Sequence, residues 1–221
     1  VKFRETGYDT EFTGSFSCND PFMNELWKRS ARTLYITMRD SYMDCPDRER
    51  AQWWGDEVNE LGEAFYALSP SGQKLAVKGI HELMNWQRED GTLYAPVPAG
   101  NWDKELPLQM LASVGWYGFY TQYYYSADSS FVPMIYDRMR RYLHEVWQVD
   151  KSGLVIERQG AWSWGDWGEH VDMGVLTNCW YYLALKAERA FALQLGKDKD
   201  ADEISRMMRS IERCFDTKFW T

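Results

Sequence analysis

Cysteine and histidine are scarce in this sequence, and their spacing excludes several kinds of site. The four cysteines lie far apart with no Cys-x-x-Cys pair, so the sequence predicts neither a zinc site nor a disulfide framework. The three histidines are equally scattered, and we expect no cofactor and no metal. Cys45 has an acidic neighbour and a proline but no nearby histidine, which argues against a catalytic thiol.

Positive charge is also in deficit. The 221 residues include 25 Lys and Arg against 33 Asp and Glu, which gives a net charge of -8. Nucleic-acid binding needs clustered basic side chains that displace counterions, so no nucleic-acid partner is expected. The one basic cluster, residues 138–141, lies in a helical pattern beside Asp137 and Glu145, and we expect a solvent-exposed helix face.

No segment has the character of a membrane span, and no membrane partner is expected. The longest uncharged run covers residues 106–127, which is long enough to cross a bilayer. It contains a proline, two glutamines and, from Tyr120 to Tyr125, four tyrosines, so a buried helix with aromatic residues on all sides explains it better. No secretion signal is visible, and because the chain begins at Val1 we expect the natural N-terminus to lie upstream. The compartment stays open.

Aromatic residues, by contrast, are abundant. Twelve Trp, 14 Tyr and 10 Phe make up 16% of the chain. Tryptophan at this density is typical of a groove that binds flat ligands such as sugars, and packing in a large core is the alternative explanation. The length and the hydrophobic content of 45% fit one large globular domain.

Hydrophobic spacing predicts helix after helix. Asp20 followed by Pro21 is a helix start signal. Weak β alternation is confined to residues 1–16 and 153–157. Short turns alternate with long loops, which predicts an all-α fold of antiparallel hairpins around a cleft, an α/α toroid, rather than a repeat solenoid with a fixed period. We expect seven helices. The first begins near residue 20 and the second near Asp47. The other five cover roughly 73–87, 108–125, 131–147, 175–195 and 201–215.

The most informative segment is Asp44–Asp56, with the sequence DCPDRERAQWWGD. Its acidic side chains crowd around two arginines and two adjacent tryptophans. A carboxylic acid beside an aromatic face can protonate a glycosidic oxygen while a sugar ring stacks on the indole. If a helix begins near Asp47, then Glu49, Trp53 and Asp56 share one of its faces. The alternative is an ordinary helix start, where acids favour the macrodipole and arginines pair with them.

Two further loops carry tryptophan. The run 162–170, WSWGDWGEH, contains three tryptophans and two carboxylates. We expect Trp164, Asp166 and Trp167 to bind substrate as one wall of a site. A hydrophobic plug that closes the toroid, with Asp166 capping a helix, is the alternative. Trp102, in the preceding long loop, is a further candidate for a platform on which a sugar stacks.

The segment DCPDRERAQWWGD closely resembles the signature of bacterial α-L-rhamnosidases, glycoside hydrolase family 78, in which an Asp-Cys-Pro-x-Arg-(x)-Glu-Arg run leads to Trp-x-Gly-Asp. Residues 14–21 look like the start of that family's first catalytic-domain helix, residues 164–167 like its Gly-Asp-Trp loop, and residues 215–220 like the end of a later helix. The resemblance implies an (α/α)6 toroid over residues 20–221, preceded by a segment, 1–19, that leads in from a β-domain.

By the same resemblance, the activity is hydrolysis of terminal α-L-rhamnosides with inversion, and the partner is a rhamnose-containing oligosaccharide or glycoside. Glu49 would be the general acid. Asp44, Arg48 and Asp56 would hold rhamnose hydroxyls, with Trp53 as an apolar wall. Acidic neighbours favour the protonated form of such an acid and arginines favour the ionised form, so the sequence leaves their balance open.

An inverting enzyme also needs a carboxylate base about 6.5–9.5 Å from the acid. In the family this base is a glutamate late in the toroid, so we expect it beyond Thr221 and interpret the chain as a fragment. Within this chain, Asp166 and Glu169 are alternative candidates for the base, although the family resemblance does not support either of them. Two other functions stay open: another (α/α)6 glycosidase, such as a glucuronidase or glucosidase, and a carbohydrate-binding helical domain without catalysis.

Overall fold

The structure is a computed structural model that describes residues 1–3, 6–100, 102–158, 162–163, 165 and 167–220. Within these ranges the chain is helical, β pairing is limited to isolated bridges, and the predicted all-α class is confirmed. The helices are α1 (Pro21–Ile36), α2 (Trp54–Ala67), α3 (Ser71–Asn85), α4 (Pro107–Val114), α5 (Phe119–Ser126), α6 (Val132–Arg141), the π-helix η1 (Tyr142–Val146), α7 (Met173–Gln194) and α8 (Asp198–Phe219).

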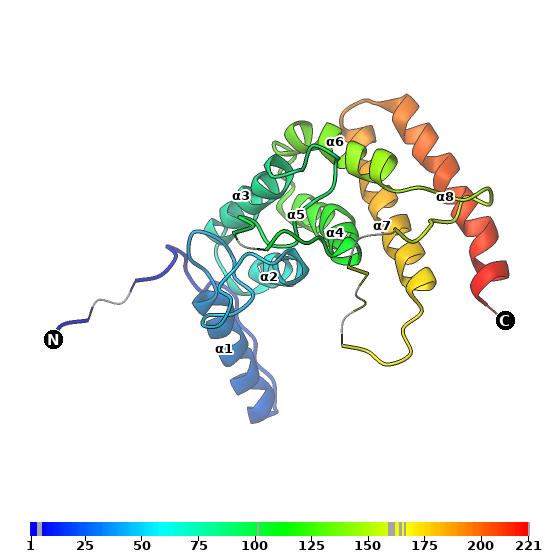
Figure 1. Cartoon of the computed structure of the whole chain (residues 1–221). Helices are drawn as coiled ribbons and strands as arrows, with labels where there is room; N and C mark the ends of the chain where they lie inside the picture. Colours follow the sequence, from blue (N-terminus) through cyan, green and yellow to red (C-terminus); the bar gives the residue numbers. More distant parts are fainter. Residues whose placement is uncertain (4–5, 101, 159–161, 164, 166, 221) are drawn as a thin grey trace.

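Figure 1 shows these helices as an arc, with α2, α4 and α5 in the middle, α1 at one end and the α7–α8 hairpin at the other. The buried side of α2 holds the arc together: Trp54, Val58 and Leu61 are buried, as their spacing predicts. Trp54 meets Phe119 of α5 edge-on, with ring centroids 5.7 Å apart. None of the described helices is long and apolar enough to cross a bilayer.

Capping side chains set two of the helix starts. The predicted cap at Asp20 is confirmed, since its carboxylate accepts a 2.8 Å hydrogen bond from the amide of Phe22 while Pro21 occupies the first helical position. Asp172 caps α7 in the same way by accepting from Val175 at 3.0 Å. Each cap satisfies an amide that the helix itself cannot, and the cap at Asp20 was predicted from local sequence whereas the cap at Asp172 was not.

The prediction of one helix over residues 108–125 is wrong, because the chain forms α4 and α5 with a turn between them. A Cβ atom on Gly118 would lie 2.1 Å from the carbonyl oxygen of Ser113, so only glycine fits this turn. Gly115 similarly allows α4 to approach α7 closely at Ala184. The all-round burial expected for this run also fails in α5, where Tyr124 and Tyr125 are exposed.

The β patterns expected at 1–16 and 153–157 yield single bridges and no strand in the described part of the chain. Phe12 bridges Leu68 at the turn between α2 and α3, and Val155 bridges Val149. The latter bridge closes a small hairpin that is tied to α7, because Asn178 accepts the amide of Val155 at 2.8 Å.

The basic cluster on α6 is only partly a solvent-exposed face, so that prediction needs correction. Arg138 is exposed, whereas Arg140 is half-buried and pairs with two acids on the neighbouring helices. Its guanidinium lies 3.2 Å from the fully buried Glu188 of α7 and also contacts Glu203 of α8. His144 approaches the same Glu188 carboxylate at 2.9 Å. The cluster thus stabilises the packing of three helices.

Candidate active site

The segment around Glu49 is a closed loop and not the start of a helix. α2 begins at Trp54, so the prediction of a helix from Asp47 is wrong. The amide of Asp44 donates to the carbonyl of Ala51, and the Asp44 carboxylate accepts from the Ala51 amide, both at 3.0 Å. Two hydrogen bonds therefore join the ends of the loop, which outweighs the weak helical preference of the residues between them.

A neighbouring extended segment fixes the far end of this loop. The backbone amide of Val97 donates to the carbonyl of Gln52 at 3.1 Å, and the side-chain amide of Gln52 donates to the carbonyl of Val97 at 2.9 Å. The amide of Trp54 donates to Ala95 at 3.0 Å, and Trp53 forms an isolated bridge with Pro96. The first turn of α2 is therefore held against residues 95–97.

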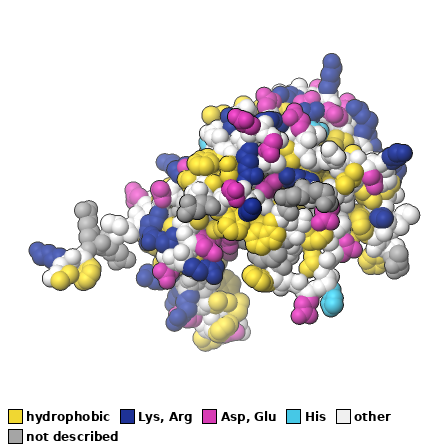
Figure 2. Space-filling view, in the orientation of Figure 1, with side chains coloured by type: hydrophobic (Ala, Val, Ile, Leu, Met, Phe, Trp, Pro, Cys, Tyr) yellow, Lys and Arg dark blue, Asp and Glu magenta, His cyan; other side chains and the backbone are white. Residues whose placement is uncertain are grey.

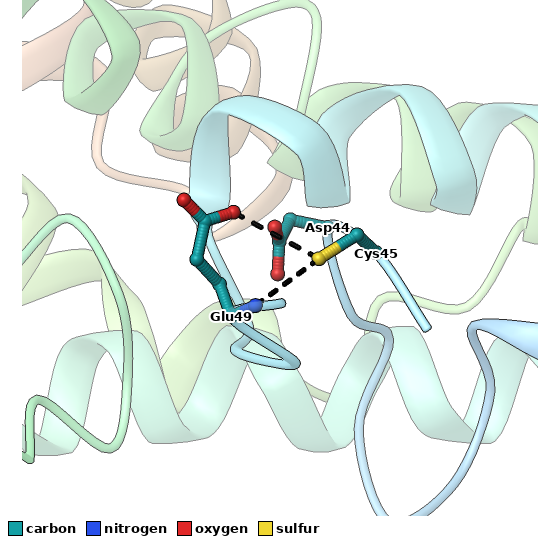
Figure 3. Close-up of side chains that lie close together, drawn as sticks. All are labelled: Asp44, Cys45 and Glu49. Atoms are coloured by element: carbon teal, nitrogen blue, oxygen red, sulfur yellow. Dashed lines mark hydrogen bonds between the residues drawn. The ribbon is translucent and has the colours of Figure 1, made fainter. Parts of the chain in front are cut away.

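Three side chains of the loop converge (Figure 3). The Sγ atom of Cys45 accepts the amide of Glu49 at 3.3 Å and lies 3.8 Å from the Glu49 carboxylate. Arg48 lies 2.7 Å from the other oxygen of Glu49, in a pair that is largely exposed. Arg50 has a left-handed backbone, with φ of 52°, which is uncommon for a residue with a side chain and is typical of functional loops.

The charge of Asp44 is stabilised by its surroundings. Burial raises the pKa of Asp44, but hydrogen bonds to the side chains of Glu49 and Cys45 and to the amides of Ala51 and Cys45 outweigh it, so the pKa is lowered overall. Asp44 therefore favours its ionised form, in which its carboxylate accepts hydrogen bonds from its neighbours.

These side chains open into a cleft of about 710 Å³. Three indoles form one wall: the ring of Trp102 lies 5.1 Å from Trp53 and 5.7 Å from Trp162. Figure 2 shows hydrophobic side chains in the middle of this face, with acidic and basic side chains around them. The cleft is lined by Asp44, Cys45, Arg48, Glu49, Trp53, Gly55, Asp56, Asn59, Trp102, Leu106, Gln109, Trp162 and Trp167.

Most of the residues selected from the sequence meet in this cleft. Seven of them line it, from three separate segments: Asp44, Arg48, Glu49, Trp53, Asp56, Trp102 and Trp167. Trp167 is 93% exposed and stands at the edge of the cleft. The predicted Trp164 and Asp166 lie outside the described residues. Glu169, the other candidate for the base, is exposed and is not among the residues that line the cleft.

Several residues that line the cleft were not predicted from the sequence. Asn59 follows Asp56 by three positions on α2, so a correct start for this helix would have placed it on the same face. Gln109 comes from α4 and packs over Gly55, where a Cβ atom would lie 2.5 Å from its side chain. No pattern in the sequence indicates that contact. Trp162 was noted as part of its run but was not selected as a ligand.

A thiol and two carboxylates form a possible cation-binding group. The ligand atoms of Asp44, Cys45 and Glu49 all lie within 4.8 Å of one another, and no other such group occurs among the described residues. Each of the three already has a protein partner: the Ala51 amide, the Glu49 amide and the Arg48 guanidinium. These contacts serve to orient the carboxylates.

A further carboxyl of α2, that of Glu60, interacts electrostatically with Asp44 and Asp56 of the cleft. Burial is the main cause that raises the pKa of Glu60 to about 8, and the negative charges of Asp56, Glu63 and Asp44 raise it further. A hydrogen bond from Thr37 lowers it in part. The stabilising contribution of the protonated carboxyl is complete below the ordinary pKa of 4.5 and is lost as the pH rises toward about 8. The fold is therefore less stable in alkaline conditions on account of this residue.

Glu60→Gln should remove this pH dependence, because glutamine resembles the protonated acid and cannot ionise. We expect the melting temperature of the variant to exceed that of the wild type increasingly between about pH 4.5 and about pH 8. Thermal unfolding followed by circular dichroism across this range would measure the difference. Glu89→Gln, at an exposed loop position, is the control. A constant difference between Glu60→Gln and wild type would contradict the assignment.

The geometry can be set beside known proteins. Residues 11–221 match the family model described as the bacterial alpha-L-rhamnosidase 6 hairpin glycosidase domain. The GH78 family rhamnosidase of Bacillus sp. GL1 has a TM-score of 0.85 at 22% identity, over 97% of this chain and 22% of that one. The alpha-L-rhamnosidase of Dictyoglumus thermophilum gives 0.82 at 19% identity, over 96% and 24%.

A third structure, a rhamnosidase from Klebsiella oxytoca with rhamnose bound, gives a TM-score of 0.81 at 17% identity, over 96% of this chain and 41% of that one. No curated protein sequence matches the chain. The chain thus spans between 22% and 41% of the length of these three structures. Over the matched part, this chain shares their fold, in agreement with the predicted toroid class. With the family model matched over residues 11–221, the chain belongs to the bacterial α-L-rhamnosidase six-hairpin glycosidase family.

Proposed function

We propose that this domain takes part in hydrolysis of terminal α-L-rhamnosides, with Glu49 as the general acid. The observation that carries the proposal is the position of the Glu49 carboxyl in a tryptophan-lined cleft, next to Asp44 and Arg48. A general acid must hold a proton and must face the leaving oxygen. Glu49 lines the cleft and can therefore face that oxygen, with Asp44 and Arg48 beside it.

The other lining residues have roles that suit a sugar. The carboxylates of Asp44 and Asp56 accept hydrogen bonds from sugar hydroxyls, and Arg48 donates to them. Trp53, with Trp102 beside it, presents an apolar face against which the C–H groups of a pyranose pack. The cleft of about 710 Å³ accommodates a sugar together with part of its aglycone.

We further propose inversion at the anomeric carbon, which needs a second carboxylate about 6.5–9.5 Å from the acid to activate water. The proposed base is a glutamate from polypeptide beyond Thr221. Asp44 does not suit this role, because its carboxylate lies within 4.8 Å of that of Glu49, which is closer than the spacing of an inverting pair. Rhamnose is the proposed sugar because the family model is that of a rhamnosidase and the Klebsiella oxytoca relative is described with rhamnose bound.

Release of nitrophenol from p-nitrophenyl α-L-rhamnopyranoside tests the proposal, with this chain and the complete gene product assayed in parallel. Activity in the complete product alone supports the rhamnosidase chemistry and a base beyond Thr221. Activity in both directs attention to Asp166 and Glu169 as bases. No activity in either overturns the choice of rhamnose, and a panel of other aryl glycosides then separates another glycosidase from a carbohydrate-binding domain.

A further inference from the structure

A buried ion pair joins the two long loops that carry tryptophan into the cleft. The guanidinium of Arg158 lies 2.8 Å from the carboxylate of Glu105, and their side chains are only 15% and 3% exposed. Burial disfavours the charge of Arg158, but the hydrogen bond to Glu105 outweighs it and raises the pKa of the arginine. The buried guanidinium is therefore stabilised in its charged form by its contact with Glu105.

Each partner stands a few residues from an indole of the cleft. Glu105 follows Trp102 by three positions and directly precedes Leu106, which also lines the cleft. Arg158 precedes Trp162 by four positions. The rings of Trp102 and Trp162 have centroids 5.7 Å apart and form one side of the cleft. The ion pair and the indole contact thus connect the same two loops at neighbouring points.

Rigid elements support both partners. The second carboxylate oxygen of Glu105 accepts a 2.8 Å hydrogen bond from the hydroxyl of Tyr142, at the start of η1. On the other side, Arg158 lies over the ring of Trp147, 5.2 Å from its centroid. Arg158 follows the hairpin that Asn178 of α7 holds at Val155. Both ends of the pair are consequently fixed to helices.

Stability alone gives a weak reason for such a pair. Taking two charges out of water costs about as much as their attraction returns, and a well-packed apolar pair often serves equally well. An ion pair differs in that it tolerates only a narrow range of geometries, so it specifies one relative position of the two chains it joins. An aromatic platform carried by two long loops requires such a fixed relative position of the loops.

We propose that Glu105 and Arg158 are positioning residues that hold Trp102 against Trp162 and thereby set the width of the sugar-binding cleft. The proposal rests on the proposed function only for the identity of the sugar. Neither residue is among those that line the cleft, so both act through the tryptophans.

The test uses Arg158→Met, which keeps the length of the side chain and removes its charge. Arg140→Met is the matched control, because it breaks another buried arginine–glutamate pair, with Glu188, away from the cleft. The first measurement is the exciton signal of contacting indoles in circular dichroism. To isolate the contribution of Trp162, the spectrum of each background is compared with and without the additional change Trp162→Phe. The backgrounds are the wild type, Arg158→Met and Arg140→Met, each recorded below its unfolding temperature.

We expect Trp162→Phe to change the spectrum equally in wild type and Arg140→Met, and to have little effect in Arg158→Met, where the indoles have separated. The second measurement is kcat and KM for p-nitrophenyl α-L-rhamnopyranoside in the complete gene product. There Arg158→Met should lower kcat/KM by about 10- to 100-fold, the usual scale for a misplaced binding wall. Arg140→Met should leave it within about twofold of wild type.

Arg158→Lys and the double variant Glu105→Gln with Arg158→Met guard against a simple folding defect. Lysine keeps the charge without the planar fork and should restore part of the exciton signal. The double variant removes the isolated buried charge, so it should recover stability without recovering the indole contact. An unchanged exciton signal in Arg158→Met overturns the positioning role, whichever sugar the cleft binds. A lost signal in Arg158→Met together with no rhamnosidase activity in the wild type overturns the proposed function and leaves the positioning role intact.

Discussion

Glu49→Gln should lower turnover of a natural rhamnoside by roughly 10²–10⁴-fold in the complete gene product, the usual contribution of a general acid. Glutamine keeps the shape of the side chain and its contacts with Arg48 and Cys45, but it has no acidic proton. Substrate binding should therefore stay nearly unchanged, so that the loss falls on kcat and leaves KM close to the wild-type value. Steady-state kinetics measures both constants.

The choice of leaving group gives this experiment its internal control. A nitrophenol leaves without much help from an acid, so p-nitrophenyl rhamnoside should suffer less from Glu49→Gln than an alkyl rhamnoside or a disaccharide. Glu89→Gln, outside the cleft, should leave both substrates unaffected. Equal losses on the two kinds of substrate, or no loss on either, would show that Glu49 is not the acid.

Arg140→Met should destabilise the fold by about 3–5 kcal/mol, which is the cost of removing one partner from a buried ion pair. Glu188 is fully buried and would lose its guanidinium partner, while its contact with His144 would remain. The same change would free Glu203, so α8 would lose one of its attachments to α6. Urea unfolding followed by circular dichroism would give the change in the free energy of unfolding.

The exposed pair of Arg29 and Glu25 on α1 is the control for that measurement. Its oxygen and nitrogen lie 2.8 Å apart, shorter than the 3.2 Å between Arg140 and Glu188, but its side chains are 77% and 53% exposed. Arg29→Met should therefore cost no more than about 0.5 kcal/mol. Similar losses for the two variants would mean that burial does not decide the strength of these pairs.

The helices could be predicted wherever a local signal starts or stops them. Asp20 with Pro21 begins α1, and the spacing of Trp54, Val58 and Leu61 gives the buried side of α2. The start of α2 could not be predicted, because the acids and arginines after Asp47 suit a helix. Their backbone is held elsewhere by the pairing of Asp44 with Ala51 and by residues 95–97, which are distant in sequence.

The same division applies to the cleft. The motif from Asp44 to Asp56 predicts a cluster of acids and tryptophans because those residues are contiguous and the chain has little freedom to separate them. Gln109 reaches the cleft only because α4 packs across Gly55, and the sequence holds no trace of that packing. The ion pair of Glu105 and Arg158 is likewise invisible, since 53 positions separate two residues of very common types.

The hydrogen bonds between Asp44 and Ala51 make the acid-bearing loop a unit of fixed length. Insertions or deletions between these two residues would break its closure. For enzyme engineering this divides the cleft into a part to keep and a part to vary. A library intended to change the aglycone should randomise the surroundings of Trp102 and Trp162 and leave residues 44–51 untouched, so that each member keeps the same proposed general acid.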